Sequence, residues 1–418
     1  MRIFRLDNPI QHYAWGSSDG ITRALGIPNP EGGPFAELWM GAHPIAPSRI
    51  QVDGQPIGLD AYIAADPEGC LGKRCVERLG DELPFMFKAL SAGTPLSIQA
   101  HPGKRKAERG FERENLSGVP LNAPERNYRD PNHKPEASIA LTHLEILCGF
   151  RPLPDFLRIL ALFGPTKFAK RFERIERNPS RLELSVLFYG LVSAEDGVKA
   201  EMLEFVGEAL PALLEGDEAP DDVKDAYRWV LRLIELFPGD IGALAPLILN
   251  LVELEPGQSV FIAPGEPHAY LSGTCLEIMS NSDNVIRGAL TRKHVDLPEL
   301  ASVLSFTPER VVPVEPEFSG DGAGPSPDVG IEEFYPIFVP DFQVSRLRLA
   351  PGASWKRASS GPDIILCAEG EAEIAAPRGG KLGLSLGDSA FARADSGPYR
   401  VSSKGGALLY RASVPEIP

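Results

Sequence analysis

Three short segments of the chain combine histidine with other side chains that bind metals. The first contains Gln99 and His101, whose i, i+2 spacing would place both side chains on one face of a strand. The second is a tight turn that leads into His268. In the third, a proline holds Lys134 in an extended conformation and so directs Glu136. Imidazole, carboxylate and amide groups together suit a borderline divalent metal such as zinc at a catalytic site.

Each of these histidines also has a second interpretation. A single histidine on the face of a β-sheet is more often a core residue whose hydrogen bonds are satisfied. Glutamine is, in addition, a rare ligand of zinc. The spacing of the residues alone therefore leaves a metal site and an ordinary core open.

Three regions that differ in composition and residue pattern must position these side chains. Residues 1–150, and the chain from about residue 250, contain short apolar runs between proline and glycine, which predicts β structure. Residues 151–245 carry apolar stripes of helical period, such as Met202–Ala209, and Phe237 with the following Pro-Gly should end the last helix. The proline- and glycine-rich stretch 319–327 is the predicted linker.

A short internal repeat points to two related β barrels. Gly257–Phe261 resembles Gly387–Phe391, and each reads as a turn that enters a strand, although chance recurrence would give the same pattern. Aligning the two segments puts Pro398 where His268 would be, and residues 331–418 contain no Gln-x-His. We therefore expect a single metal site, in the first barrel.

Several multi-residue blocks, in the same order, resemble the type I mannose-6-phosphate isomerases (phosphomannose isomerases). The resemblance runs through most of the chain. The blocks are Tyr13–Gly16, Glu37–Gly41 with His43-Pro44, Leu83–Phe85 with Lys88, Pro95–Pro102, Tyr128–Glu136, His268–Leu271, Glu277, Ser282–Asn284 and Arg287.

The resemblance implies a mainly β fold, with two cupin-type (jelly-roll) β barrels and an inserted α-helical domain. Residues 1–150 plus 246–318 would form the catalytic cupin domain, and residues 151–245 the helical insertion. Residues 319–418 would form a C-terminal cupin-like domain without metal.

The resemblance also assigns roles to individual residues. It implies one zinc ion per chain, with the ligands Gln99, His101, Glu136 and His268. It implies a sugar-phosphate pocket near Lys88 and Ser97, and a catalytic group of Arg287, Glu277, Lys134 and Lys293. The chain departs from the usual family pattern at Arg287-Gly288-Ala289, and at Thr291-Arg292-Lys293, where the family usually has a proline before the lysine.

The implied reaction interconverts mannose 6-phosphate and fructose 6-phosphate through an enediol, and would feed mannose and GDP-mannose metabolism. Zinc would act as a Lewis acid and Arg287 would stabilise the developing negative charge. We rank Glu277 above Lys134 as the group that carries the proton. The alternatives are another cupin metalloenzyme, such as an iron dioxygenase, and a metal-stabilised sugar-phosphate-binding cupin protein without catalysis.

Composition narrows the class of partner. The formal net charge is −15, which disfavours nucleic acid and anionic membranes and leaves a small-molecule sugar phosphate as the expected partner. Five scattered cysteines predict free thiols in a reducing cytoplasm. We see no apolar run of signal-peptide or membrane-span length. The sequence leaves the oligomeric state open and is compatible with a monomer.

Overall fold

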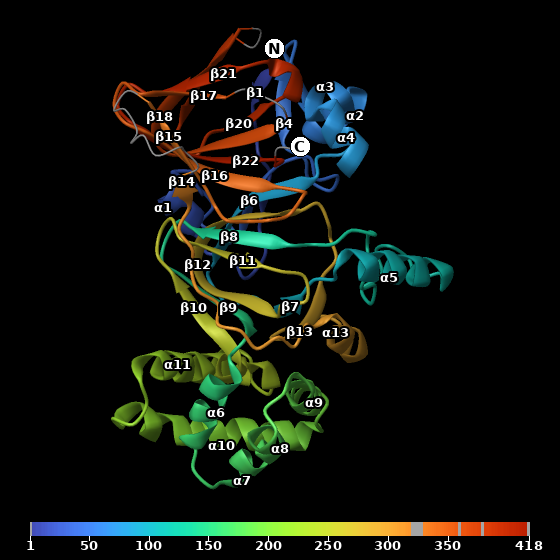
Figure 1. Cartoon of the computed structure of the whole chain (residues 1–418), viewed down its shortest axis with the longest axis vertical. Coiled ribbons are helices and arrows are strands. Elements are labelled where there is room, and N and C mark those ends of the chain that lie inside the picture. The colour runs from blue at the N-terminus through green and yellow to red at the C-terminus, as the bar shows by residue number, and fades with distance from the viewer. Residues whose placement is uncertain (1, 319–328, 358–360, 378–379, 416–418) are drawn as a thin grey trace.

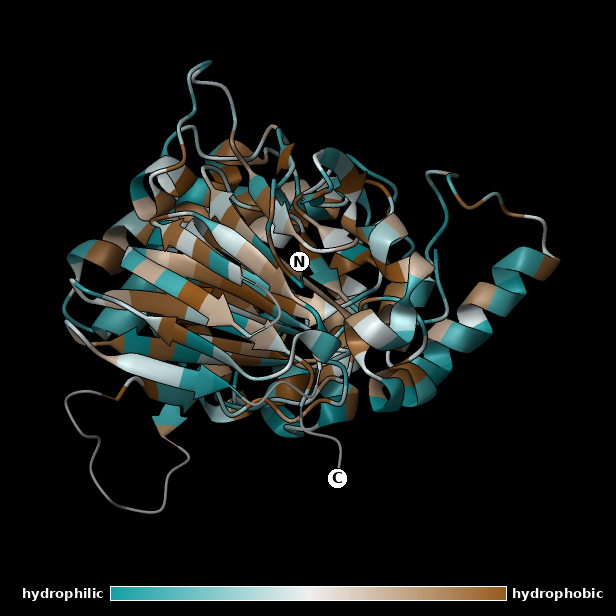
Figure 2. Ribbon diagram, turned by 90° about the horizontal axis from the view of Figure 1, so that it is seen from above, coloured by the Kyte–Doolittle hydropathy of each residue, from teal (hydrophilic) through white to brown (hydrophobic). Residues whose placement is uncertain are grey.

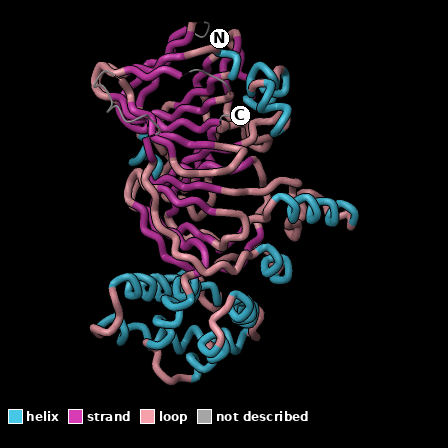
Figure 3. The backbone as a smooth tube through the Cα atoms, viewed as in Figure 1, coloured by secondary structure: helices cyan, strands magenta, loops and turns pink. Residues whose placement is uncertain are grey.

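The computed structural model describes residues 2–318, 329–357, 361–377 and 380–415. Within them the chain is mainly β, with two ten-stranded sheets stacked along the long axis and a group of helices at one end (Figures 1 and 3). The first sheet contains β2, β3 and β6–β13, and the second sheet contains β1 and β14–β22. The predicted linker at 319–327 lies outside the described residues.

The strands of the first sheet follow the chain with one long interruption. They are β2 (Ile10–Gln11), β3 (Glu37–Met40), β6 (Phe85–Ala92), β7 (Ile98–Ala100), β8 (Glu136–Ala140), β9 (Leu144–Phe150), β10 (Leu249–Leu254), β11 (Ser259–Ile262), β12 (His268–Ser280) and β13 (Ile286–Ala289).

The second sheet is built from the C-terminal part of the chain and one N-terminal strand. Its strands are β1 (Ile3–Arg5), β14 (Glu317–Phe318), β15 (Ile331–Phe334), β16 (Gln343–Leu349), β17 (Ser354–Arg357), β18 (Asp363–Ala376), β19 (Gly380–Ser385), β20 (Ser389–Ala392), β21 (Tyr399–Ser402) and β22 (Ala407–Ser413). A separate hairpin joins β4 (Arg49–Val52) and β5 (Gln55–Gly58).

Most helices fall in two groups. Near the second sheet lie α2 (Leu59–Ala65), α3 (Pro67–Leu71) and α4 (Lys73–Leu79), and α1 (Gly20–Leu25) packs on β6. The helical end holds α6 (Leu153–Ala161), α7 (Lys167–Lys170), α8 (Glu173–Arg177), α9 (Arg181–Val192), α10 (Asp196–Glu215), α11 (Asp221–Leu236), the 3-10 helix η1 (Ile241–Leu244) and α12 (Ala245–Ile248). The others are α5 (Lys104–Leu116), α13 (Leu297–Val303) and η2 (Ala394–Ser396).

The apolar run around residues 83–90 becomes β6, a central strand that is buried on both faces. Its side chains alternate between the faces. Phe85, Phe87 and Ala89 join the hydrophobic layer between the two sheets, whereas Lys88 and Leu90 point into the first sheet's own interior. Hydrophobic residues accordingly gather in the stacked strands of Figure 2, while the projecting helix α5 is largely hydrophilic.

The chain leaves the first sheet after β9, forms the helices α6–α12, and returns as β10, which pairs with β9. The predicted apolar stripes lie on α10 and α11, and α11 ends at Leu236, directly before the predicted Phe-Pro-Gly stop. The helical core also includes Ile98 and Ile286, so it covers the back of β7 and β13. No helix of the described residues is long and apolar enough to cross a membrane.

The first strand departs from the predicted domain division. β1 pairs antiparallel with β20, with Ile3 opposite Ala392, so the start of the chain belongs to the second sheet. The predicted first domain began at residue 1. The pairing could not be anticipated, because a three-residue strand carries no signal about which of two sheets it joins.

The internal repeat corresponds to a repeated strand topology. The order β3-β6-β12 in the first sheet matches β15-β16-β22 in the second. β11 pairs with β8 as β20 pairs with β18, and these registers place Glu136 opposite Ile262 and Asp363 opposite Ala392. Asp363 is therefore the counterpart of Glu136 in the second sheet.

The residue of the second sheet that is equivalent to His268 lies one position later than predicted. His268 begins β12 and pairs with Gln99 on β7, whereas Tyr399 begins β21 and pairs with Arg357 on β17. Tyr399, not Pro398, thus occupies the equivalent position, because the turn before β21 is one residue longer. The expectation that this position carries no histidine is confirmed.

A buried ionic cluster fills the equivalent place in the second sheet. Asp363 is fully buried and pairs with Arg411 at 2.7 Å, and Arg357 lies 3.6 Å away. The hydroxyl of Tyr399 donates a hydrogen bond to Asp363 at 2.7 Å, and Arg411 also pairs with Glu332 at 2.6 Å. Guanidinium groups therefore neutralise the buried carboxylate here, which removes the need for a metal ion.

We expect Asp363→Ala to destabilise the second sheet by about 3 kcal/mol, because buried guanidinium groups and Tyr399 lose their shared partner. Chemical denaturation monitored by fluorescence measures the loss. Glu373→Ala on the same strand is the matched control. Its carboxylate is 45% exposed and pairs with Lys381, so less than about 1 kcal/mol should be lost. Equal losses for the two variants would contradict the role of the cluster.

Candidate metal centre and its surroundings

Three of the four predicted metal ligands converge in the interior of the first sheet. Nε2 of His101 lies 3.3 Å from one carboxylate oxygen of Glu136, and Nε2 of His268 lies 3.2 Å from the other. All three side chains are buried, and their ligand atoms lie within 4.8 Å of one another. Among the described residues this is the one cluster of His, Cys, Asp and Glu with metal-binding geometry.

The hydrogen bonds around the two histidines leave their inner nitrogens free to bind a cation. Nδ1 of His101 donates to the carbonyl of Asn284 at 2.7 Å, and Nδ1 of His268 donates to the carbonyl of Glu266 at 3.1 Å. Each Nε2 therefore presents a lone pair toward the carboxylate of Glu136. Burial lowers the pKa of His101 to about 4, so this imidazole is neutral at neutral pH.

These inner atoms lack the partners that buried polar atoms require. Nε2 of His101, Nε2 of His268 and Oε2 of Glu136 are buried without a hydrogen-bond partner. A lone pair facing a carboxylate is repulsive, and orphaned buried acceptors are costly. A divalent cation bound between them would satisfy all three, so the residues fit a metal ion with nitrogen and oxygen ligands.

Gln99 lies beside this cluster in the sheet. It pairs with His268 on one side and with Arg287 on the other. Residues directly opposite one another on paired strands point to the same face. The register thus places the predicted fourth ligand next to His268, and puts Arg287 on the same face.

Lys134 and His133 point in different directions. The ammonium of Lys134 is buried and lies 3.2 Å from Glu136, so this lysine borders the metal cluster. His133 instead approaches Asp341, with 3.0 Å between the ring nitrogen Nε2 and the carboxylate. Although it neighbours Lys134 in the sequence, His133 is not a metal ligand.

A buried ionic network occupies the neighbouring interior. The ammonium of Lys88 lies 2.6 Å from Glu277 and 2.9 Å from Glu37. The hydroxyl of Tyr270 donates to the other oxygen of Glu277 at 2.5 Å and contacts Ser138. Two carboxylates thus share one lysine, and the ammonium of Lys88 is already neutralised.

The charges of this network set its protonation. Burial opposes the charged form of Lys88, but the adjacent Glu277 and Glu37 raise its pKa well above the ordinary value. Burial raises the pKa of Glu277, an effect that Lys88 partly offsets. Glu277 is therefore a buried carboxyl group with an elevated pKa, as general acid–base groups often are.

Three basic side chains gather at the edge of the site. The backbone N–H of Arg129 donates to the side chain of Asn284 at 2.7 Å, which places Arg129 beside the start of β13. Burial, followed by repulsion from Arg129, lowers the pKa of Arg287, and the pKa of Lys293 is lowered by burial and by both arginines. Within the described chain no carboxylate forms an ion pair with any of the three, and only the charge of Asp283 acts on Arg129, so the group is predominantly cationic.

The structure brings into the site four residues to which the sequence patterns assign no role. Glu37 holds Lys88, Tyr270 holds Glu277, Asn284 anchors both His101 and Arg129, and Arg129 joins the cationic group. All lie within the blocks that carry the family resemblance. The roles of Glu37, Asn284 and Arg129 depend on partners far along the chain, which spacing does not reveal, whereas Tyr270 and Glu277 both lie on β12.

Known proteins are similar to this chain over nearly its whole length. The family model for the catalytic domain of type I phosphomannose isomerase matches residues 3–153. A mannose-6-phosphate isomerase of Salmonella typhimurium is 39% identical over 96% of this chain and 97% of its own. The chain belongs to the type I phosphomannose isomerase family.

More distant members and solved structures agree with this membership. Mannose-6-phosphate isomerase 1 of Arabidopsis thaliana is 33% identical and covers 99% of this chain and 94% of its own. The structure of the Salmonella typhimurium mannose 6-phosphate isomerase bound to fructose 6-phosphate and zinc aligns with a TM-score of 0.86, at 38% identity, over 99% of this chain and 100% of that chain. A zinc-bound mannose 6-phosphate isomerase also aligns with a TM-score of 0.86.

We expect His268→Ala to weaken binding of Zn²⁺ by about 100-fold or more, because one of three convergent ligands is lost. Isothermal titration calorimetry, in which Zn²⁺ is added to the metal-free protein, measures the change in affinity. His133→Ala is the control, since its ring contacts Asp341 and not the cluster. Unchanged affinity in His268→Ala would contradict the assignment of the metal centre.

Proposed function

We propose that this chain is a zinc-dependent mannose-6-phosphate isomerase that converts mannose 6-phosphate to fructose 6-phosphate and back. The observation that carries the proposal is the buried cluster of His101, Glu136 and His268, whose inward atoms have no partners. This cluster lies beside an acid–base network and a cationic edge, which a simple structural metal site would not need. The family membership supports the same reaction.

The metal site would provide the electrophile. Gln99, His101, Glu136 and His268 would hold one zinc ion, which when bound polarises a substrate oxygen as a Lewis acid. The guanidinium of Arg287 lies on the same face as Gln99 and His268 and would stabilise negative charge on the reacting oxygens.

Isomerisation requires one proton to move between neighbouring carbons. We infer that a base removes the proton from C2, the C2–H electrons form a C1–C2 double bond, and the C1 oxygen takes a proton to give an enediol. The O2 proton then leaves as the carbonyl forms at C2, and a proton is delivered to C1. Glu277 suits this role because its carboxylate is buried, has a raised pKa and is oriented by Lys88 and Tyr270.

Lys134 remains the second candidate for proton transfer. Its ammonium lies against Glu136, so it can donate a proton near the metal centre. Because its amine nitrogen is engaged with Glu136, itself a predicted metal ligand, we rank Lys134 below Glu277 as the base.

The phosphate is a dianion and needs cations that are not already paired. Arg129 and Lys293 are exposed, border Arg287 and form no ion pair within the described chain, so we propose them as phosphate contacts. The predicted roles of Lys88 and Ser97 stay predictions. Ser97 is half-buried just before β7, whereas Lys88 would first have to exchange its carboxylate partners for phosphate.

Several finer interpretations belong to the same proposal. We interpret the two sheets as cupin barrels and the helices between β9 and β10 as an inserted domain. The place in GDP-mannose metabolism, the cytoplasmic location and a monomeric state stay predictions.

A coupled assay tests the reaction directly. We expect conversion of mannose 6-phosphate to fructose 6-phosphate to be lost on chelation and restored by Zn²⁺, because the ligand set fits a single divalent ion. Zinc bound at full stoichiometry without turnover would instead favour the non-catalytic sugar-phosphate-binding protein.

Glu277→Gln should bind Zn²⁺ normally and lower kcat by about 10²- to 10⁴-fold, because the amide cannot accept the proton. In the unmodified protein, activity should fall as the pH decreases through the pKa of Glu277, which lies above the ordinary 4.5, since only the ionised form is a base. Stopped assays across pH, with exchange of the C2 proton into deuterated water, measure both effects.

Glu145→Gln is the matched control for that substitution. Its carboxylate accepts hydrogen bonds from Trp229 and Ser272 at 2.7 and 2.6 Å and lies outside the site. Near-normal exchange of the C2 proton in Glu277→Gln would exclude Glu277 and leave Lys134 as the base.

A further inference from the structure

The segment that carries Arg287 and Lys293 leaves the sheet irregularly. Arg287 pairs with Gln99, but Ala289 pairs with Ile98, so Gly288 is an extra residue that forms a β-bulge. Leu290 then adopts a positive φ of 55°, which is unfavourable for a side chain of this kind. A bulge followed by such a residue requires support from surrounding structure to hold one conformation.

The charges on this segment also oppose its present conformation. Arg287 and Lys293 lie close to each other and to Arg129, and none of them forms an ion pair with a carboxylate of the described chain. This like-charge repulsion disfavours the close approach of the three side chains. Packing and hydrogen bonds of the segment act against it.

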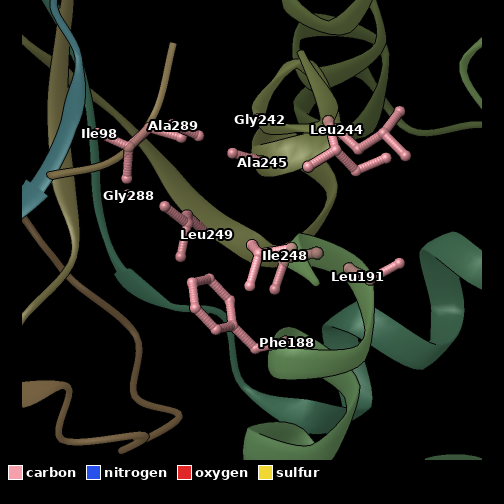
Figure 4. Close-up of a pocket in the computed structure, with 12 residues that line it drawn as sticks. Ile98, Phe188, Leu191, Gly242, Leu244, Ala245, Ile248, Leu249, Gly288 and Ala289 are labelled. Atoms are coloured by element: carbon pink, nitrogen blue, oxygen red, sulfur yellow. The ribbon is translucent and has the colours of Figure 1, made fainter. Parts of the chain in front are cut away.

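The helical segment supplies one such contact through Gly242. A Cβ atom at Gly242 would lie only 2.4 Å from Cβ of Ala289, so η1 packs directly against β13. Gly242, Ala245, Ala289 and Ile98 together line a small apolar cavity of about 40 Å³, shown in Figure 4. The methyl group of Ala289 thus occupies the space that a glycine in η1 leaves open.

Asp240 supplies a second contact, made by hydrogen bonds. One carboxylate oxygen accepts the N–H of Gly242 at 2.8 Å and so caps η1. The other accepts the N–H of Thr291 at 3.4 Å, and the hydroxyl of Thr291 in turn accepts the N–H of Lys293 at 3.1 Å. A single side chain therefore links the start of η1 to the loop that carries Lys293.

We propose that Gly242 and Asp240 are positioning residues, through which the helical segment holds Arg287 and Lys293 in their working orientation. This inference rests on the proposed isomerase function and adds to it the element that aligns the cationic edge. Both contacts involve segments where the chain departs from the family pattern: Gly242 accommodates the methyl group of Ala289, and Asp240 binds a loop that lacks a proline before Lys293.

The first test moves a methyl group from one side of the contact between Gly242 and Ala289 to the other. Gly242→Ala should press on Ala289, displace Arg287 and lower kcat by about tenfold with little change in KM. Adding Ala289→Gly to the same protein removes the opposing methyl and should restore kcat to within about twofold. Zn²⁺ stoichiometry should stay at one per chain in both, because no metal ligand contacts Gly242.

The second test separates capping of η1 from bridging to the loop. Asp240→Ser keeps an N-cap oxygen for Gly242 but is too short to reach Thr291 as well. We expect a rise in KM of about fivefold, because Lys293 is no longer fixed for the phosphate. Asp196→Ser is the control. Asp196 and Asp240 both line one surface hollow of about 490 Å³, but Asp196 has no hydrogen bond to the loop.

Hydrogen–deuterium exchange makes the inference independent of turnover. The peptide covering residues 286–293 should exchange faster in Gly242→Ala and Asp240→Ser, and slow again in the methyl-exchange double variant. Unchanged exchange in that peptide would overturn the positioning role, even in a protein that does not isomerise mannose 6-phosphate. Lowered thermal stability with unchanged exchange, kcat and KM would show a purely structural contact and also overturn it. An inactive unmodified protein, by contrast, would count against the proposed function alone.

Discussion

The buried carboxylate of Glu136, set between two imidazole lone pairs, is the constraint on which the rest of the site depends. Each of its oxygens lies close to an Nε2 atom, and the Nδ1 atoms are already committed to backbone carbonyls. Such a cluster of acceptors is costly to bury, and a cation at its centre would satisfy it. The carbonyl of Asn284 fixes the ring of His101, and the side chain of Asn284 fixes Arg129, so the ligand geometry and the cationic edge share one anchor.

The two sheets neutralise a buried carboxylate at the same register position in different ways. In the first sheet Glu136 meets histidines that leave room for a metal ion, whereas in the second sheet Asp363 meets Arg411, Arg357 and Tyr399. An arginine supplies positive charge permanently and cannot polarise an exchangeable ligand. A histidine cluster leaves the charge to an ion with open coordination positions. The first arrangement suits chemistry, and the second suits a stable scaffold.

The features that could be predicted from the sequence depend on local residue patterns or on the blocks that resemble the family. The stripes on α10 and α11, the stop after Leu236 and the convergence of His101, Glu136 and His268 are all confirmed. What the sequence missed depends on partners far along the chain. Nothing near Lys88 shows that Glu37 and Glu277 neutralise it, and a turn one residue longer shifted the counterpart of His268 from Pro398 to Tyr399. The bond from Asp240 to Thr291 joins two loops whose approach only the packed structure defines.

The pairing of β1 with β20 also constrains the order in which the chain can fold. Ile3 lies opposite Ala392, so an edge of the second sheet joins two strands that lie very far apart in the sequence. The first sheet, by contrast, is complete once β13 at Ile286–Ala289 has been made. On the ribosome the half of the molecule that carries the metal ligands can therefore assemble early. β1 stays unpaired until β20 has been made, and pairing across such a long sequence separation is slow.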